Sequence, residues 1–215
     1  MKFNKYLIFL VFTVLILSVS AVNATEIDLN DNLTTFNLNN QVSTASVTST
    51  PDKTWTVEYF LSNYNQISSG ETILIKNGTG TVTQQMDLTK NGVNIITEGN
   101  VILQSDGGNH RCFYITGANI LIQGITFNNF KVNVDGGVIK WNGNNGILKN
   151  CNFNNNTASG NNQWGGAVQC PGTAFEMSYC KFIGNSASKG GAFSYCSTSK
   201  TDSYCTVSNC IFIDN

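Results

Sequence analysis

The sequence predicts an all-β solenoid of parallel strands, because one short segment recurs along its second half at a nearly constant spacing. The copies are GILKNCNFNNN (146–156), FEMSYCKFIGN (175–185) and CTVSNCIFIDN (205–215), with a weaker one, NILIQGITFNN, at 119–129. Their phenylalanines lie 26, 29 and 30 residues apart, a period typical of stacked repeats. Paired glycines at 136–137, 165–166 and 190–191 alternate with them. Two motifs therefore repeat in register.

Aligning the copies on their phenylalanines predicts where each coil bends. Five residues before the phenylalanine stand Ile122, Leu148, Met177 and Val207. Two residues before it stand Ile125, Cys151, Cys180 and Cys210. Inward residues of a strand recur every two positions, so the step of three between these two sets requires a corner. Each repeat therefore contains at least two strands joined by a bend, and each coil pairs only with its neighbours.

This register assigns a structural role to every repeated residue. Coils rise by ~4.8 Å, the spacing of strands, so the phenylalanines form one interior stack, and each buried ring contributes roughly 1.5 to 3 kcal/mol. Three residues after them stand Phe130, Asn156, Asn185 and Asn215. We expect the asparagines to form an amide ladder at a turn. The glycine pairs fit where the chain needs positive φ or passes close to a neighbouring coil.

One helix is predicted, over residues 54–68. Its apolar residues recur at helical spacing, with Thr54 or Thr56 as N-cap and Gly70 as terminator. An amphipathic helix here would cover the open N-terminal end of the solenoid, and packing on a side face is the alternative. Short β segments follow it, at 71–75, 93–96, 101–103, 112–115 and 120–122.

The N-terminus has the layout of a secretory signal peptide over residues 1–24. Lys2 and Lys5 precede an apolar run at 6–22, and the small residues Ala21 and Ala24 follow. An uncleaved membrane anchor is the alternative. Residues 25–53 are polar, without apolar period, and are interpreted as a flexible leader. The sequence therefore predicts a secreted protein, or one held at the cell surface or in the cell envelope.

Composition argues against several classes of function. Only 12% of residues are charged and the net charge is -1, so neither nucleic acid nor an anionic membrane surface is expected as a partner. The membrane is expected to contact the chain only through the signal peptide during export.

The seven cysteines lack the spacing of a metal site, and we interpret them as mostly free, buried thiols, because in-register parallel neighbours rarely allow disulfide torsion. From residue 119 onward the carboxylates are Asp135, Glu176, Asp202 and Asp214, at unrelated repeat positions. Asp106, His110 and Arg111 form the nearest polar cluster, interpreted as a loop. No catalytic, cofactor-binding or metal-binding residue is predicted.

The repeats resemble the polymorphic outer-membrane-protein family, in which GGA(I/L/V) alternates with FxxN, and related adhesin-like surface proteins of archaea. FxxN is matched by Phe153/Asn156, Phe182/Asn185 and Phe212/Asn215, and GGA by residues 165–167 and 190–192. The first repeat departs from both motifs, with Phe130 and Val138 at the Asn and Ala places. The resemblance implies a right-handed parallel β-helix with an N-terminal cap helix, exported or displayed on a surface and associated with adhesion.

Three hypotheses for function follow. The first is a non-enzymatic, adhesin-like protein whose shaft displays loops, such as 156–164, to a surface glycan or protein. The second is a polysaccharide lyase or hydrolase, a class that needs clustered carboxylates, a cation, or Arg and Lys beside a cleft. The third is a truncated reading frame without independent function, because the last coil is incomplete at Asn215. That uncapped end is also expected to allow stacking.

Overall fold

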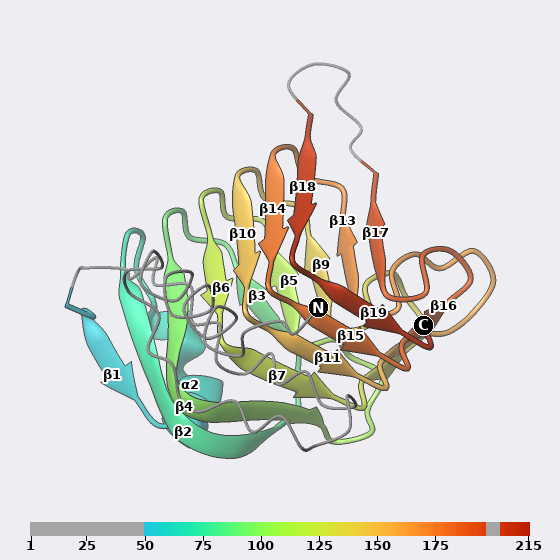
Figure 1. Ribbon diagram of the computed structural model, residues 1–215. Helices are drawn as coiled ribbons and strands as arrows, with labels where there is room; N and C mark the ends of the chain where they lie inside the picture. Colours follow the sequence, from blue (N-terminus) through green and yellow to red (C-terminus); the bar gives the residue numbers. More distant parts are fainter. Residues whose placement is uncertain (1–49, 197–202) are drawn as a thin grey trace, which may run out of the picture. The chain divides into compact units, whose positions relative to one another are not determined.

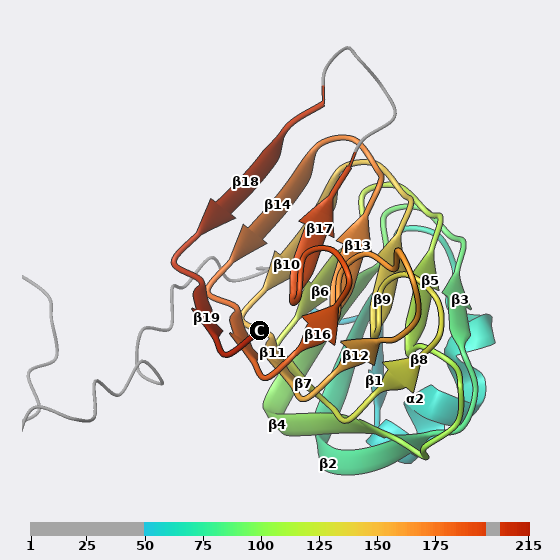
Figure 2. The same cartoon turned by 90° about the vertical axis from the view of Figure 1, so that its right-hand side faces the viewer.

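Parallel strands from successive coils build the protein in a computed structural model that describes residues 50–196 and 203–215. They lie in sheets of eleven, five and three strands, here called sheets A, B and C. The described residues form a right-handed parallel β-helix of about 5 turns with one short α-helix, as Figures 1 and 2 show. The predicted fold class is therefore confirmed.

The strands are short, except two in the first coils. Sheet A contains β1 (Lys53–Trp55), β2 (Thr72–Val82), β4 (Asn94–Ser105), β6 (Leu121–Gln123), β7 (Ile125–Asn128), β10 (Gly146–Lys149), β11 (Asn152–Asn154), β14 (Phe175–Ser178), β15 (Lys181–Ile183), β18 (Cys205–Ser208) and β19 (Ile211–Ile213). Sheet B contains β3 (Met86–Leu88), β5 (Phe113–Ile115), β9 (Ile139–Trp141), β13 (Val168–Cys170) and β17 (Phe193–Tyr195). Sheet C contains β8 (Lys131–Val132), β12 (Thr157–Ala158) and β16 (Ser186–Ala187).

The predicted signal peptide at 1–24 and the leader up to residue 49 lie outside the described residues. The predicted leader extends to residue 53, and the structure has Lys53 in β1, where it pairs with Ile73 of β2.

The segments predicted separately at 93–96 and 101–103 form the single strand β4. Gly99 has a φ of 78°, so the chain bends there without leaving the sheet. Pairing with β2 continues on both sides of a register shift between Lys76 and Gly78. Further along, β4 pairs with both β6 and β7. This one strand is therefore the neighbour of both strands that flank the corner of the next coil.

The predicted corner is present in every repeat of sheet A. Three residues before the phenylalanine, at Gly124, Asn150, Tyr179 and Asn209, φ lies between 50° and 87°. A left-handed residue at this place turns the chain from the first strand of the repeat into the second. The strands before and after the corner then pair in register with those of the next coil, as Leu148 does with Met177 and Phe153 with Phe182.

The phenylalanines form the predicted stack. Ring centroids of Phe127 and Phe153 are 4.9 Å apart, those of Phe153 and Phe182 are 4.7 Å apart, and those of Phe182 and Phe212 are 4.8 Å apart. The last two pairs are nearly parallel, at 4° and 3°. Phe127, Phe153 and Phe182 are fully buried, whereas Phe212 is 47% exposed on the last described coil.

The asparagine ladder is also present, and the amides of Asn156 and Asn185 each join three coils. Nδ2 of Asn185 donates to Oδ1 of Asn215 at 2.7 Å and to the Phe153 carbonyl at 3.0 Å. Oδ1 of Asn185 accepts from the backbone N–H of Asn156 at 3.1 Å and from Nδ2 of Asn156 at 2.9 Å. Asn156 and Asn185 are buried, so these bonds satisfy groups that water does not reach.

Both predicted roles of the glycine pairs are found, one for each glycine. The first glycine has positive φ: 66° at Gly136 and Gly165 and 62° at Gly190. The second faces the next coil, since a Cβ on Gly166 would overlap the carbonyl oxygen of Gly191. The pair therefore lets the turn close and the coils approach.

The helix covers the N-terminal end, as predicted, but it is shorter than the predicted range 54–68. Helix α2 (Val57–Asn63) begins after Thr56, whose side chain accepts a hydrogen bond from the Tyr59 N–H at 3.2 Å. The 3₁₀ helix η2 (Tyr64–Gln66) follows it. Residues 54 and 55 are in β1 instead, because pairing with β2 satisfies their backbone.

Helix α2 closes the interior stack. The Phe60 ring is fully buried, 6.3 Å from that of Phe113, which in turn lies 6.0 Å from Phe127. A Cβ on Gly80 of β2 would overlap Val57 and Leu61, so the helix lies directly against this strand. In Figures 1 and 2, α2 lies beside β2 at the end opposite to β18 and β19. No helix of the described residues is long and apolar enough to cross a membrane.

Replacing Phe153 with Ala should lower the free energy of unfolding by about 3 to 5 kcal/mol, because the ring is buried and stacked on both sides. Phe212→Ala is the control and should cost less, because that ring is half exposed and stacked on one side only. Urea denaturation followed by circular dichroism measures both. If both variants lost the same free energy of unfolding, burial of the rings would not be the source of the stability of the stack.

Asn185→Ala should destabilise the protein more than Asn154→Ala. The first change leaves several buried backbone and amide groups without partners, each costing about 1 to 3 kcal/mol. The second removes one bond, from Nδ2 of Asn154 to Oδ1 of Asn128, on a partly exposed face. Urea denaturation compares the two variants. If Asn154→Ala lost more free energy of unfolding than Asn185→Ala, the buried ladder would not be the more stabilising of the two contacts.

Candidate functional site

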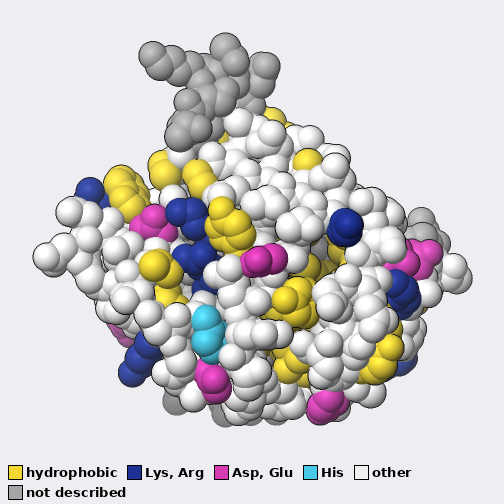
Figure 3. All heavy atoms as spheres, turned by 180° about the vertical axis from the view of Figure 1, so that it is seen from behind, with side chains coloured by type: hydrophobic (Ala, Val, Ile, Leu, Met, Phe, Trp, Pro, Cys, Tyr) yellow, Lys and Arg dark blue, Asp and Glu magenta, His cyan; other side chains and the backbone are white. Residues whose placement is uncertain are grey.

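The central residues of the sheet B strands are aligned across the coils. Strand pairing aligns Asp87, Tyr114, Lys140, Gln169 and Ser194, here called the sheet B row. On β3, β5 and β9 both flanking residues of the strand are buried, so alternation turns the central one toward the outer face. Gln169 and Ser194 are themselves buried, with 4% and 7% of their surface exposed. Figure 3 views the molecule from this side, where Lys, Arg, Asp and Glu side chains gather beside hydrophobic ones.

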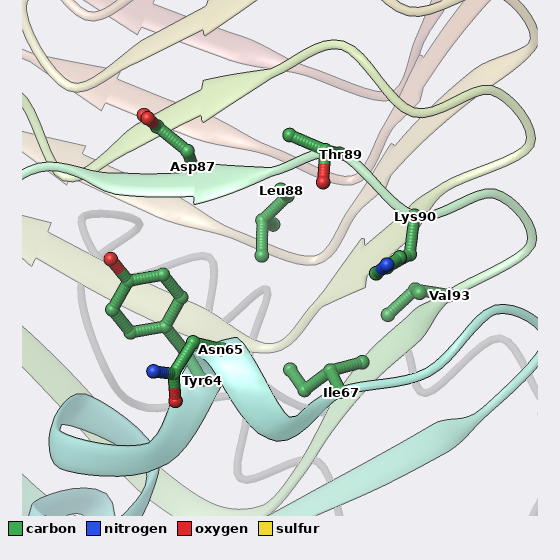
Figure 4. A pocket seen from close by; sticks show the side chains of 8 residues that line it. All are labelled: Tyr64, Asn65, Ile67, Asp87, Leu88, Thr89, Lys90 and Val93. Atoms are coloured by element: carbon green, nitrogen blue, oxygen red, sulfur yellow. The ribbon is translucent and has the colours of Figure 1, made fainter.

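A small pocket lies at the N-terminal end of the row, where η2 approaches β3. Its volume is ≈ 120 Å³, and it is lined by Tyr64, Asn65, Ile67, Asp87, Leu88, Thr89, Lys90 and Val93. Figure 4 shows Tyr64 and Asp87 toward one end of this pocket and Lys90 toward the other. Because Asp87 belongs to both features, the pocket and the row form one continuous surface.

A chain of hydrogen bonds connects the first coils of this surface. Nε2 of Gln85 donates to Oδ1 of Asp87 at 2.7 Å, and Oε1 of Gln85 accepts from Nη1 of Arg111 at 3.2 Å. Arg111 also donates to the carbonyls of Asp135 at 2.8 Å and Gly136 at 3.3 Å. Burial lowers the pKa of Arg111, yet an arginine remains charged in a protein. This buried cation therefore holds the turn of the next coil in place.

Asp135 is the centre of the network on the following coils. Its Oδ2 lies 3.2 Å from Nζ of Lys140, and its Oδ1 accepts from the backbone N–H of Trp164 at 2.9 Å. The ring of Trp164 in turn lies 4.6 Å from Nζ of Lys189. Asp135 thus links Lys140 of its own coil to Trp164 of the next, and Trp164 contacts Lys189 of the coil after that.

Two aromatic side chains offer partly exposed rings on the same surface. The hydroxyl of Tyr114 accepts from Nδ2 of Asn142 at 2.8 Å, and its ring lies 5.8 Å from the Arg111 guanidinium. Trp164 is held through its backbone by Asp135 and over its ring by Lys189. These contacts restrict both side chains before any ligand arrives, which lowers the entropy lost on binding.

The polar cluster singled out in the sequence is separated in the structure. Nε2 of His110 lies 3.0 Å from Oδ1 of Asp106. The Gly108 N–H hydrogen bond is the main cause of the lowered pKa of Asp106, with His110 contributing less. Arg111 donates instead to the sheet B network. All three residues lie in the predicted loop between β4 and β5, but the side chain of Arg111 reaches out of it to the sheet B network.

The remaining carboxylates of the repeats do not join this site. Glu176 is exposed on β14 and Asp214 is exposed after β19, whereas Asp202 lies outside the described residues. Within residues 50–196 and 203–215, no group of three or more His, Cys, Asp or Glu side chains could hold a metal ion.

The sequence matches no protein-family model and no curated protein sequence. The candidate site therefore depends on the geometry of sheet B alone. A signal for part of it was present in the sequence, since Lys140, Gln169 and Ser194 each stand three residues after the second glycine of a pair. Asp87 and Tyr114 precede the recognisable repeats and could be placed only through strand pairing.

Arg111→Ala should lower the free energy of unfolding by about 1 to 3 kcal/mol, because it leaves the carbonyls of Asp135 and Gly136 without their donor. Lys131→Ala is the control, since Lys131 is exposed at the start of β8. Chemical denaturation measures both variants. An unchanged midpoint for Arg111→Ala would show that the network does not hold the turn.

Proposed function

We propose that the protein is a non-enzymatic, exported, adhesin-like surface protein that binds a glycan along the outer face of sheet B. The observation that carries this proposal is the accessible part of the sheet B row, in which Asp87, Tyr114 and Lys140 present a different polar or aromatic side chain on three successive coils. Coils rise by ~4.8 Å, so an extended chain of sugars lying along the row meets a new side chain at each step.

The chemistry of the surface suits a carbohydrate. Sugars present hydroxyl groups, which pair with both donors and acceptors, and apolar ring faces, which pack on aromatic side chains. Lys140 and Asp87 supply a donor and acceptors, and Tyr114 and Trp164 supply partly exposed rings. The pocket beside Tyr64 would hold one end of the sugar chain.

The arrangement of the charged groups favours binding over catalysis. A hydrolase needs an acid and a second carboxylate at a defined separation, and a lyase needs a base free to take a proton. Both oxygens of Asp135 are engaged, one by Lys140 and one by the Trp164 N–H. Lys140 is itself the partner of Asp135, so neither group is poised for proton transfer.

Export and surface display are supported by the sequence. The pattern at 1–24 is that of a secretory signal, and the GGA and FxxN motifs resemble those of surface-displayed repeats. A polysaccharide lyase or hydrolase is the second candidate, because Asp87, Tyr114 and Lys140 place acidic, phenolic and basic groups on adjacent coils of one face.

The test is affinity electrophoresis of the protein through gels that contain acidic or neutral polysaccharides. We expect retardation by at least one polysaccharide, and a loss of affinity of about three- to tenfold in Tyr114→Ala and in Trp164→Ala, the contribution of one aromatic ring. Tyr59→Ala is the matched control, because Tyr59 is an exposed aromatic residue of α2 away from the row.

Each polysaccharide is also incubated with the protein, and the products are assayed for unsaturated sugars and new reducing ends. Release of either would overturn the non-enzymatic proposal in favour of the lyase or hydrolase. If Tyr59→Ala abolished the retardation while Tyr114→Ala and Trp164→Ala left it unchanged, binding would lie elsewhere on the molecule.

A further inference from the structure

The small pocket at the N-terminal end of the sheet B row lies where sheet B itself ends. Strand β3 is the edge strand of this sheet, and among the described residues the 3₁₀ helix η2, not another strand, contacts its free side. The backbone of Met86 and Leu88 bonds toward β5, to Cys112 and Thr116. Because backbone groups alternate in direction along a strand, the N–H and C=O of Asp87 face the other way, toward η2. The pocket therefore borders an unpaired strand edge.

The floor of the pocket is apolar, whereas its two ends are polar. Ile67, Leu88 and Val93 line the floor, and none of them is more than 5% exposed. Figure 4 shows Leu88 between Asp87 at one end and Lys90 at the other. A ligand that fills this pocket therefore needs an apolar group between two polar ones.

The polar side chains around the pocket have unused hydrogen-bonding capacity. Within the described part of the chain, no hydrogen bond or ion pair engages Nζ of Lys90 or the hydroxyls of Tyr64 and Thr89. Oδ1 of Asp87 accepts from Nε2 of Gln85 at 2.7 Å, which leaves its second oxygen available. Asp87 and Lys90 are the only charged residues of the lining, and their charges offset one another.

This combination of charge and floor selects among the substituents that sugars carry. A carboxylate, as in a uronic acid, would be repelled by Asp87, and a free amine would be repelled by Lys90. Either charge would also lose its water over the apolar floor, which is costly. An acetamido group is neutral, ends in a methyl group and carries the donor and the acceptor of a peptide group. It can therefore cover the floor and pair with the strand edge.

We propose that this pocket is a subsite for an acetamido sugar at one end of the glycan that lies along the sheet B row. The acetyl methyl group packs on Leu88, the amide pairs with the free edge of β3, and Asp87 and Tyr64 bind hydroxyl groups of the ring. Lys90 excludes the corresponding free amine. This inference rests on the proposed function, because it names the class of sugar that one end of the bound glycan carries.

The test is saturation-transfer NMR of the full-length chain with methyl glycosides of N-acetylglucosamine, glucosamine and glucose, together with the matching galactose series. Within each series the sugars differ only in the substituent on carbon 2. We expect the acetamido sugar to bind about fourfold or more tightly than the hydroxyl sugar, the contribution of one buried methyl group. Its acetyl methyl protons should receive the strongest saturation. Equal affinities within both series, or no binding of either acetamido sugar, would overturn the proposal.

Lys90→Met keeps the apolar stem of the side chain and removes its charge. This variant should bind the amine sugar about threefold or more tightly than the unaltered protein does, because a like charge is removed. Lys131→Met is the matched control, since Lys131 is exposed on β8 and does not line the pocket. An unchanged affinity for the amine in Lys90→Met, or the same gain in Lys131→Met, would contradict the selecting role of Lys90.

Variants of the row separate this subsite from glycan binding as a whole. Tyr114→Ala and Trp164→Ala should leave the preference among the monosaccharides unchanged, because neither residue lines the pocket. If polysaccharides retard the protein while the monosaccharides bind without preference, the subsite is wrong and the proposed function stands. If the acetamido sugars bind with the expected preference and no polysaccharide retards the protein, the subsite stands and binding along the row is wrong.

Discussion

The structure depends on one constraint, the in-register parallel pairing of each coil with the next. Because strands lie about 4.8 Å apart, every repeated position places a residue against its own counterpart. Only side chains that pair favourably with themselves can fill such a column. Aromatic rings stack, amides both donate and accept, thiols pack, and glycines let backbones meet. Like charges directly opposite one another are destabilising, which explains why a chain built this way is only 12% charged.

Corners impose a second demand, which explains the abundance of asparagine. A coil returns to its starting point only if several residues adopt positive φ. Of the ten residues other than glycine with positive φ in residues 50–196 and 203–215, seven are Asn. Asn tolerates this conformation because its short amide can hydrogen-bond locally. The same residue type therefore serves two purposes, in corners such as Asn150 and in the buried ladder at Asn156 and Asn185.

These constraints also determine what the sequence could reveal. Where a position repeats its residue type, as at Phe153 and Phe182, the register and the ladder are readable without a structure. The helix boundary was misplaced because Trp55 fits the helical apolar pattern equally well, and only pairing with β2 places it in a strand. The sheet B row was missed because its members differ in type from coil to coil. The role of Arg111 depends on contacts with Gln85 and Asp135, more than twenty residues away on either side.

Specific chemistry in a solenoid should therefore arise where translational symmetry is broken, and the sheet B row illustrates one way of breaking it. Along the sheet B row the side chain changes while its place on the coil stays the same, so a linear ligand meets a sequence of distinct groups. Burial limits how far this device extends. Gln169 and Ser194 occupy the same place on later coils of the row and are only 4% and 7% exposed. The groups of the row that a ligand can reach are therefore those of Asp87, Tyr114 and Lys140.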